Sequence, residues 1–407
     1  MEILLFPLRN KSKIRESFHK NYSNFFYGNA VFSYSSARSA LYSCLKTAGV
    51  KKGDEVLISS FTCLAVPISV VALGAIPQYC DIDKLSLNVN LDSLKKNITK
   101  KTKAIVIQHT LGSAANVAKI KEFVEGRDII IIEDCALSMG STNGKTLLGG
   151  QGDASIFSLE LSKTISSGWG GILVVNNKEL AKLVSEDYKS IGEISSLKSL
   201  RMAIQAALCG IFYLPYVYPL GKYFIALFFK IRFFQPSSPL CQETGAVEDD
   251  FLSKLPMPLM SLAKAQISRF NEITSKHKTN SYIIRLKLEE LNFKILGNYP
   301  DINDSVSPRV PLLVKDRGSF IDYFLKRGIE VGQWFDGPLS PIPKNNIFNY
   351  DGEDYPNASF IAKHIVNIPC HSRLNSNDLT LIETTLSQFA KDFPEQLDIK
   401  EISQNSL

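Results

Sequence analysis

The chain lacks the cysteine and charge patterns that mark several large classes of protein. Its seven cysteines are scattered, odd in number and form no CxxC pair, which opposes both a disulfide framework and a zinc site. The net charge is only +6, from 46 basic and 40 acidic residues that are interspersed along 407 positions. This composition does not predict a nucleic-acid binder. We therefore expect a cytoplasmic protein with reduced thiols, no metal and no nucleic-acid partner.

Other features are also missing from the sequence. The N-terminal segment MEILLFPLRNKSK has a short apolar run, but no leading positive region and no small-residue cleavage site, so we do not expect a signal peptide. No internal repeat and no low-complexity tract occurs. The 45% of hydrophobic residues can form a sizeable core, and the length favours two domains or one large domain with an appendage.

Short apolar runs alternate with helical stretches in the first half of the chain. Several runs are apolar at consecutive positions, as in strands that are buried on both faces of a parallel sheet. The expected strands are 31–34, 55–59, 76–82, 104–109, 129–134, 155–159 and 172–176. With helices such as 37–49 between them, they predict a doubly wound α/β domain.

The remainder of the chain predicts a different organisation. We expect one long helix over 259–291, then a strand at 308–314, a helix at 320–328 and a last helix from about 377 to 389. The predicted division is an N-terminal segment 1–29, a large α/β domain 30–195, an apolar insert 196–240, a connecting segment 241–291, a small α+β domain 292–395 and a tail 396–407.

The apolar insert has three interpretations. Residues 202–221 carry no charge, and 222–234 set a few basic residues among aromatic and aliphatic ones. Burial in the core or in a dimer interface is the default, because large apolar segments usually find a protein partner. Spanning a bilayer is disfavoured, since Pro215 and Pro219 interrupt the uncharged stretch. Peripheral membrane contact through 202–234 is the third interpretation, because Lys222, Lys230 and Arg232 suit a headgroup region.

Two segments have residues suited to a ligand at the ends of strands. The run IIIIEDCALS (129–138) ends a buried strand in Asp134, where ligands of open α/β sheets bind, although an aspartate there could equally cap a helix. The segment YSSARSALYS (34–43) opens a helix whose free N–H groups suit a phosphate, with Arg38 as a charged donor. The alternative for this segment is a serine-capped helix with a solvated arginine.

A third segment, FSLELSKTISSGWGG (157–171), raises the possibility of a nucleophile. Ser158 ends a predicted strand and could join the same phosphate site, and Lys163 follows five positions later. A lone lysine is usually a solvated surface residue. A partly desolvated lysine instead loses proton affinity and can form an imine with an aldehyde cofactor such as pyridoxal 5′-phosphate (PLP).

These three segments together resemble the DegT/DnrJ/StrS family of PLP-dependent sugar aminotransferases. The resemblance runs from about Ser35 to Asn176 and resumes at 256–269 and 328–390. It also includes KKGDEVLISSFTCLAV (51–66), AIPQYCDID (75–83), TKAIVIQHTLG (102–112), VGQWF (331–335) and VNIPCHSRLNSND (366–378). It implies fold type I of the PLP enzymes, with a large α/β domain whose mixed, mostly parallel sheet is flanked by helices and a small α+β C-terminal domain. It also implies a homodimer whose active site lies between the subunits.

The resemblance also implies roles for individual residues. Lys163 matches the lysine that binds PLP covalently, Asp134 the aspartate that pairs with the pyridine nitrogen, and Ser158 a serine that contacts the phosphate. Ala37 and Arg38 fall on the phosphate turn. The positions of these residues match the family motif one by one, so we predict a single PLP site.

The sequence departs from the family pattern at two cofactor positions. Leu137 stands where the family commonly has Gln or His near the ring oxygen, and Cys63 stands where many members stack an aromatic on the pyridine ring. His109 falls on a strand-end position that is often polar in the family. Relatives that lack the lysine carry out dehydration, and Lys163 opposes that activity here.

The activity implied by the resemblance is a transamination. An amino group would pass, with glutamate as the expected donor, to a nucleotide-linked keto sugar in surface polysaccharide or amino-sugar biosynthesis. Two alternatives stay open: a PLP enzyme of another reaction type acting on an amino acid, and a non-catalytic relative that serves as a sensor or scaffold. The sequence does not identify the nucleotide, the sugar or the position aminated.

Overall fold

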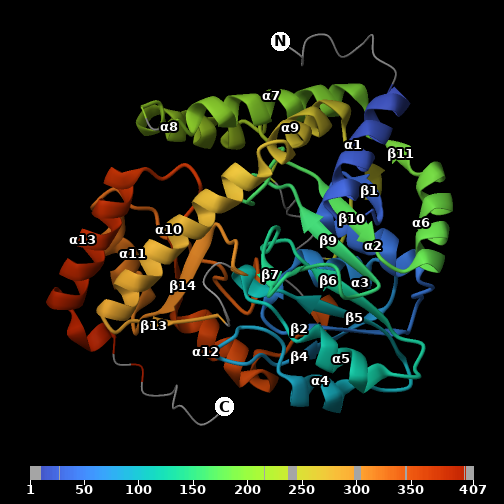
Figure 1. The fold of residues 1–407 in the computed structure, drawn as a ribbon, viewed down its shortest axis with the longest axis horizontal. Coiled ribbons are helices and arrows are strands. Elements are labelled where there is room, and N and C mark those ends of the chain that lie inside the picture. The colour runs from blue at the N-terminus through green and yellow to red at the C-terminus, as the bar shows by residue number, and fades with distance from the viewer. Residues whose placement is uncertain are drawn as a thin grey trace.

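A nine-stranded mixed sheet forms the centre of the molecule (Figure 1). The computed structural model describes residues 11–26, 28–214, 216–236, 245–297, 304–343, 346–397 and 399. In spatial order the strands are β11 (Gly192–Glu193), β12 (Ser253–Lys254), β1 (Ala30–Tyr34), β10 (Gly171–Val175), β9 (Ala154–Ser158), β6 (Ile130–Asp134), β5 (Thr102–Gln108), β2 (Glu55–Ser59) and β4 (Ile76–Cys80). Each of the seven apolar runs predicted as strands forms one of these strands.

The sheet is buried on both faces, which explains the continuous apolar runs. Successive residues of β5 alternate between two cores: Ile105 and Ile107 pack in one, and Val106 packs in the other. One face is covered by α2 (Ala37–Thr47), α3 (Ala65–Val71) and α6 (Lys178–Ser190). The other face is covered by α1 (Lys11–Phe25), α4 (Leu91–Asn97), α5 (Val117–Val124) and α9 (Met257–Ile267).

Strand direction within this sheet is mixed. The strands β4, β2, β5, β6 and β9 are parallel to one another. Strand β10 runs antiparallel to both β9 and β1, although its sequence is as apolar as that of the parallel strands. The short connection from β9 to β10 contains no helix that could return the chain for a parallel crossover, so the two strands pair as antiparallel neighbours.

The C-terminal part of the chain forms a second, smaller layer. Its sheet contains β13 (Lys294–Ile295), β14 (Arg309–Leu313) and β16 (Ile365–Pro369), all antiparallel. The helices of this part are α10 (Phe270–Glu290), α11 (Arg317–Leu325), α12 (Pro356–His364) and α13 (Ser376–Asp392). The prediction of one helix over 259–291 was wrong, because the chain breaks at Ser268 and Arg269 between α9 and α10.

Short paired segments complete the fold. β3 (Thr62–Cys63) pairs in parallel with β15 (Leu339–Ser340), so the two parts of the chain are joined beside Cys63. A hairpin of β7 (Thr142–Asn143) and β8 (Thr146–Leu147) follows β6, and the 3-10 segments are Thr110–Gly112, Asn346–Phe348, Gly352–Asp354 and Pro394–Gln396.

The apolar insert folds as two helices, α7 (Ser196–Phe212) and α8 (Tyr218–Lys230), which lie along the outside of the molecule above α9 (Figure 1). The inner side of α7 packs on the core through Met202, but many other large apolar side chains of the insert are exposed, so this chain's own core buries only part of it. The side of α8 that meets the protein contacts mainly α7. Within the described residues, no helix has the length and apolar character needed to cross a bilayer.

Candidate active site

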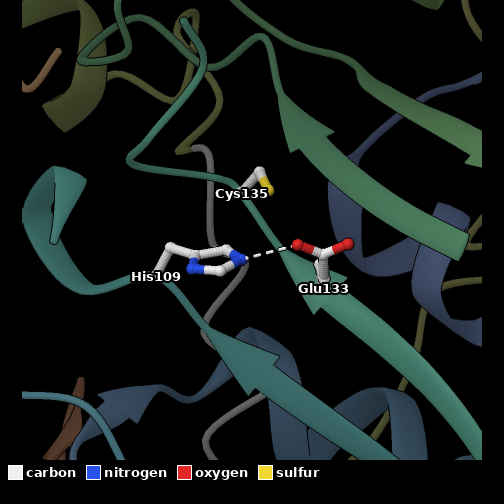
Figure 2. Close-up of side chains that lie close together, drawn as sticks. All are labelled: His109, Glu133 and Cys135. Atoms are coloured by element: carbon white, nitrogen blue, oxygen red, sulfur yellow. Dashed lines mark hydrogen bonds and ion pairs between the residues drawn. The ribbon is translucent and has the colours of Figure 1, made fainter. Parts of the chain in front are cut away.

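The carboxyl ends of β5 and β6 bring His109 and Glu133 together under the candidate site. Their side chains are fully buried, and His109 Nε2 lies 2.9 Å from Glu133 Oε2 (Figure 2). The Ala115 N–H donates to His109 Nδ1 at 3.0 Å, so this nitrogen carries no proton. Nε2–H is therefore the donor to Glu133, which fixes the imidazole as a neutral tautomer.

Cys135 lies beside this pair, and the three side chains offer ligand atoms within 4.8 Å of one another. The lone pairs that a metal would need are already engaged, because Glu133 also accepts from the N–H groups of Gly149, Gln151 and Gly152 at 2.6–3.0 Å. Burial raises the pKa of the Cys135 thiol well above its usual range. The group is thus a hydrogen-bond network around a protonated thiol.

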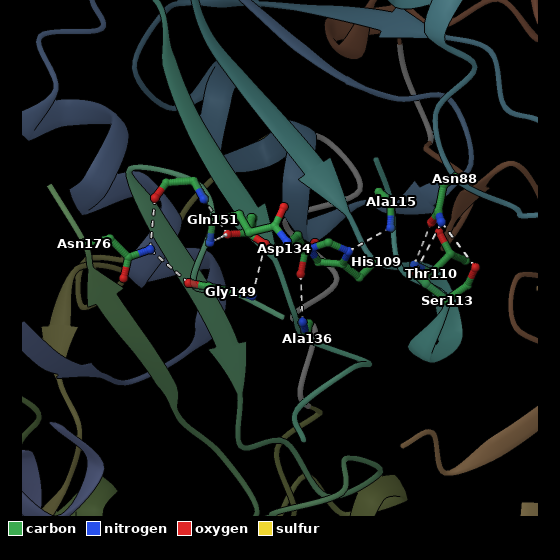
Figure 3. A network of polar contacts seen from close by, with 12 residues as sticks. Asn88, His109, Thr110, Ser113, Ala115, Asp134, Ala136, Gly149, Gln151 and Asn176 are labelled. Carbon is green, nitrogen blue, oxygen red and sulfur yellow. Dashed lines mark hydrogen bonds and ion pairs between the residues drawn. The ribbon is translucent and has the colours of Figure 1, made fainter. Parts of the chain in front are cut away.

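This network positions the loop that follows β8. Burial alone would raise the pKa of Glu133, but the hydrogen bonds from His109 and from the backbone of Gly152 and Gly149 outweigh burial and lower it. The Asn176 amide donates to the carbonyls of Gly149 and Gly152 and holds the loop from its other side (Figure 3). Hydrogen bonds therefore hold the end of β6 and the neighbouring loop in place, directly beside Asp134.

Asp134 is the last residue of β6, and its side chain is nearly fully buried. Its Oδ1 accepts from the Ala136 N–H at 2.9 Å, at the start of a turn and not of a helix (Figure 3). Burial raises the pKa of Asp134, while the Ala136 N–H and the charge of Lys163 act to lower it. The electrostatic coupling with Lys163 means that the two predicted residues face one site.

Lys163 lies in the turn after β9 and is half-buried. Its Nζ sits 4.2 Å from the centre of the Trp334 ring, which comes from the C-terminal part of the chain. Burial lowers the pKa of Lys163, opposed by the charges of Glu160 and Asp134. A lysine in this environment is available as an unprotonated amine more often than a solvated one is.

The predicted phosphate turn and Ser158 form one continuous surface. Ser158 pairs with Gly171 across β9 and β10, and a Cβ on Gly171 would lie only 2.3 Å from the Ala37 nitrogen. Strand β10 thus begins against the first turn of α2. Ser36 caps this helix by accepting from the Ser39 N–H at 3.2 Å. The helix N-terminus, Ser158 and the glycine strand end together make a cradle suited to an anion.

The remaining predicted residues fall around the same site. Cys63 is affected electrostatically by Lys163, Arg38 and Asp134, so these groups share one neighbourhood. Burial raises the pKa of the Cys63 thiol, so the thiol is protonated and forms an apolar part of the wall of the site. Leu137 is buried in an apolar cluster with Phe61. The site is consequently more apolar at both positions where the sequence departs from the family pattern.

Sequence analysis missed Arg309 as a contributor to the candidate site. Arg309 starts β14, is half-buried, and its guanidinium carbon lies 5.0 Å from the centre of the Trp334 ring. A tryptophan in the segment VGQWF is more often a core residue, although the family resemblance places this loop near the substrate; the Trp334 ring contacts both Arg309 and Lys163. The only sequence signal for Arg309 was its place near the start of the apolar run PRVPLLV. That it lies near Lys163 follows from the tertiary structure.

Comparison with known proteins identifies the family to which the chain belongs. The model of the DegT/DnrJ/EryC1/StrS aminotransferase family matches residues 8–197 and 253–387, which is most of the sequence. The chain belongs to this family. Both segments that supply the candidate site lie inside the match, and most of α7 and all of α8 lie outside it.

Curated relatives in the family match over part of their length. A GDP-perosamine synthase from Vibrio cholerae is 33% identical over 169 residues, which cover 41% of this chain and 46% of that protein. The matched segment therefore spans less than half of this relative. It establishes common ancestry of the segment and leaves the activity of the whole protein to be proposed.

Solved structures agree with the fold over nearly the whole chain. A DegT/DnrJ/EryC1/StrS aminotransferase from Brucella abortus superposes with a TM-score of 0.73 at 19% identity, covering 95% of this chain and 93% of that chain. A GDP-4-keto-6-deoxy-D-mannose-3-dehydratase from E. coli, solved with hydrated PLP, gives 0.72 at 18% identity and covers 95% and 94%. The predicted fold type is confirmed.

Proposed function

We propose that the protein is a PLP-dependent aminotransferase that transfers an amino group, with glutamate as donor, to a nucleotide-linked keto sugar. The observation that carries the proposal is the convergence of Lys163 and Asp134 at one site, with the pKa of the lysine lowered by burial. The reaction would serve surface polysaccharide or amino-sugar biosynthesis in the cytoplasm, in a homodimer. Family membership supports the activity, and the name of the Vibrio cholerae relative supports a GDP-linked sugar.

The residues present fit PLP. The cradle of Ser158, Gly171 and the α2 N-terminus with Arg38 suits a phosphate, Lys163 suits an aldehyde, and Asp134 suits a protonated ring nitrogen. The absence of a side chain at Gly171 lets the start of α2 lie directly against β10, since a Cβ there would overlap the backbone of Ser36 and Ala37. When bound, PLP supplies a carbonyl carbon for amines and a ring that accepts electrons.

Lys163 would do two tasks with its Nζ atom. As a free amine it can bond to the aldehyde, because burial lowers its proton affinity. Once released by the amino donor, the same nitrogen can take a proton from the donor carbon and return it elsewhere, as a general base and then an acid. Trp334 limits where this nitrogen can move, since its ring lies 4.2 Å from Nζ.

Asp134 would keep a proton on the ring nitrogen. Its carboxylate accepts a hydrogen bond from the Ala136 N–H. The hydrogen-bonded pair His109–Glu133 lies next to it, at the ends of β5 and β6. A buried anion at this point favours the protonated pyridine. In this proposal residues 30–195 form the cofactor domain, and residues 292–395 form the small domain that adds Arg309 and Trp334 over it. Arg309 is suited to an anionic group of a substrate.

The first experiment identifies the lysine. The purified protein with PLP should absorb visible light, and borohydride should then fix the cofactor to the peptide that contains Lys163. Lys163→Ala should lose both properties, while Lys178→Ala, which changes an exposed lysine of α6, should keep them. If the label falls on another lysine, the assignment of Lys163 is wrong.

The second experiment identifies the reaction. The protein is incubated with PLP, glutamate and a panel of nucleotide-linked keto sugars, and products are measured by mass. An aminotransferase forms 2-oxoglutarate in step with an amino sugar. Consumption of an amino acid without an amino sugar would favour another PLP reaction, and absence of any reducible link to Lys163 would favour a non-catalytic scaffold.

A further inference from the structure

The helical hairpin α7–α8 lies almost entirely outside the segments that the family model matches. Residues 198–252 lie outside the family match, and within them α7 and α8 lie along one outer side of the molecule (Figure 1). Ala206 of α7 packs against Gly168 in the loop after Lys163, whereas no residue of α8 belongs to the candidate active site described above. The function of the hairpin therefore has to be inferred from its own surface.

Hydrogen bonds fix the base of the hairpin. Arg201 donates to the carbonyls of Arg232 and Phe233, and the Gln205 amide exchanges two hydrogen bonds of 2.9 Å with the backbone of Gln235. These contacts tie the end of α8 back to the first half of α7. The apolar side chains of α8 are therefore held in place on a defined surface.

Helix α8 turns its apolar side chains to solvent. Only Gly221 of its thirteen residues is buried. Six large apolar residues of α8 and the turn after it are between 43% and 69% exposed: Leu220, Tyr223, Phe224, Leu227, Phe229 and Ile231. Soluble monomers seldom leave so many neighbouring apolar side chains in water, so this face has a partner.

The charge of the insert is of one sign. Between Ile194 and Gln242 the sequence has five basic residues and no acidic residue. Lys222, Lys230 and Arg232 are exposed on α8 and directly after it, among the apolar side chains. Aromatic and aliphatic side chains with interspersed cations match the layer where acyl chains meet anionic headgroups.

We propose that the α7–α8 hairpin binds the surface of a bilayer that contains anionic phospholipid. The apolar side chains of α8 enter the headgroup boundary, and Lys222, Lys230 and Arg232 contact lipid phosphates. Attachment is peripheral, since neither helix of the hairpin is long enough to span. A second copy of the chain is a poorer occupant, because a symmetric contact through this face would set its cations against the same cations.

The test measures binding of the full chain to vesicles by flotation. Vesicles of phosphatidylcholine alone are compared with vesicles that also contain phosphatidylglycerol, at low and high salt. The protein should float with the anionic vesicles, and less of it should float at high salt. Because the readout is binding, this result does not depend on the proposed enzymatic activity.

Two sets of variants separate the apolar and the electrostatic contributions. Leu220→Ser, Tyr223→Ser and Phe229→Ser combined should weaken anionic-vesicle binding at least about tenfold. The matched control changes three exposed leucines elsewhere, Leu183, Leu325 and Leu381, to Ser and should bind normally. Lys222→Glu with Lys230→Glu should also abolish flotation, while Lys121→Glu with Lys178→Glu should not.

The other outcomes overturn the proposal. If the wild type stays unbound with both vesicles, or the control variants lose binding equally, the hairpin is no lipid-binding surface. If the wild type stays unbound and the apolar variant halves the mass in solution, the face is an interface between copies. Circular dichroism and cofactor absorbance check the fold, and the charge variant decides the question if the apolar variant unfolds.

Discussion

Lys163 and Asp134 illustrate how burial and charge act against each other in one site. Burial favours the neutral form of each group, so the lysine pKa falls and the aspartate pKa rises. Their mutual attraction favours the charged forms and opposes both shifts. A bound cationic ring would add a partner for Asp134, so its carboxylate should gain charge when the cofactor binds.

The Asp134→Asn variant tests the role of that charge. The amide keeps the size of the side chain but loses the anion that holds a proton on the ring, so turnover should fall by orders of magnitude while PLP still binds through Lys163. Steady-state kinetics and cofactor absorbance measure the two effects separately. Near-normal turnover would restrict Asp134 to its hydrogen bond with the Ala136 N–H.

Arg38 is predicted to act at the phosphate. Replacing it with Ala should weaken PLP binding about tenfold or more, because charge-assisted hydrogen bonds contribute roughly 1.5–3 kcal/mol each. Titration of the cofactor into the apoprotein, followed by absorbance, measures the change. Arg38→Lys keeps the charge and should lose less. Unchanged PLP affinity in Arg38→Ala would assign this residue to the substrate or to solvent.

Among individual residues, the sequence motifs predicted those that lie near the carboxyl ends of neighbouring strands. Lys163, Asp134 and Ser158 follow parallel or adjacent strands, so strand order alone brings them to one edge. Arg309 and Trp334 could not be predicted as their neighbours. They reach the site through the packing of a second sheet, and no local pattern encodes which residues of the first part they meet.

Among the elements, the contact between β10 and α2 gives a sharp prediction. A Cβ at Gly171 would overlap Ser36 and Ala37, so Gly171→Ala must displace the first turn of α2. We expect lower PLP affinity together with a lower melting temperature. Gly210→Ala in α7 is the control, since a Cβ there meets no atom within 4 Å. Equal behaviour of the two variants would show that the helix start can shift freely.

The elements themselves were largely predictable, and the exceptions have physical causes. Strands that are buried on both faces are apolar throughout, and this pattern identified all seven predicted strands. Burial does not determine whether a strand runs parallel or antiparallel to its neighbours. The sequence therefore did not show that β10 is antiparallel. The break between α9 and α10 was missed because neither Gly nor Pro marks it: Ser268 and Arg269 occupy it. Exposure of the insert was missed because an apolar sequence ordinarily implies burial.

For the whole molecule, acid stability depends on a buried histidine. His277 on α10 bonds to the Ser307 carbonyl at 3.2 Å, and burial lowers its pKa to about 4, with smaller effects from Ser307 and His371. An unfolded histidine has a pKa of about 6.5, so below that pH the unfolded chain takes up a proton that the folded chain refuses. Stability should therefore decrease as pH falls from about 6.5 to about 4.

The His277→Gln variant isolates this effect. The contribution lost by the wild type over this range is on the order of 3 kcal/mol, and the variant lacks it. Urea unfolding at a series of pH values should show the two stabilities converging as pH falls, because only the wild type has the buried imidazole. Parallel curves would contradict the assignment and point to other titrating groups.

The ends of the added hairpin meet at the edge of the main sheet. Gly192 before it and Ser253 after it are direct partners in the parallel pairing of β11 with β12. The chain thus leaves and re-enters the fold at adjacent points, and the free energy of closing a loop between such points grows only slowly with its length. Evolution could lengthen, shorten or exchange this segment without moving a strand of the catalytic part. At this position the segment between β11 and β12 can differ in length while the strand pairing at the edge of the sheet stays the same.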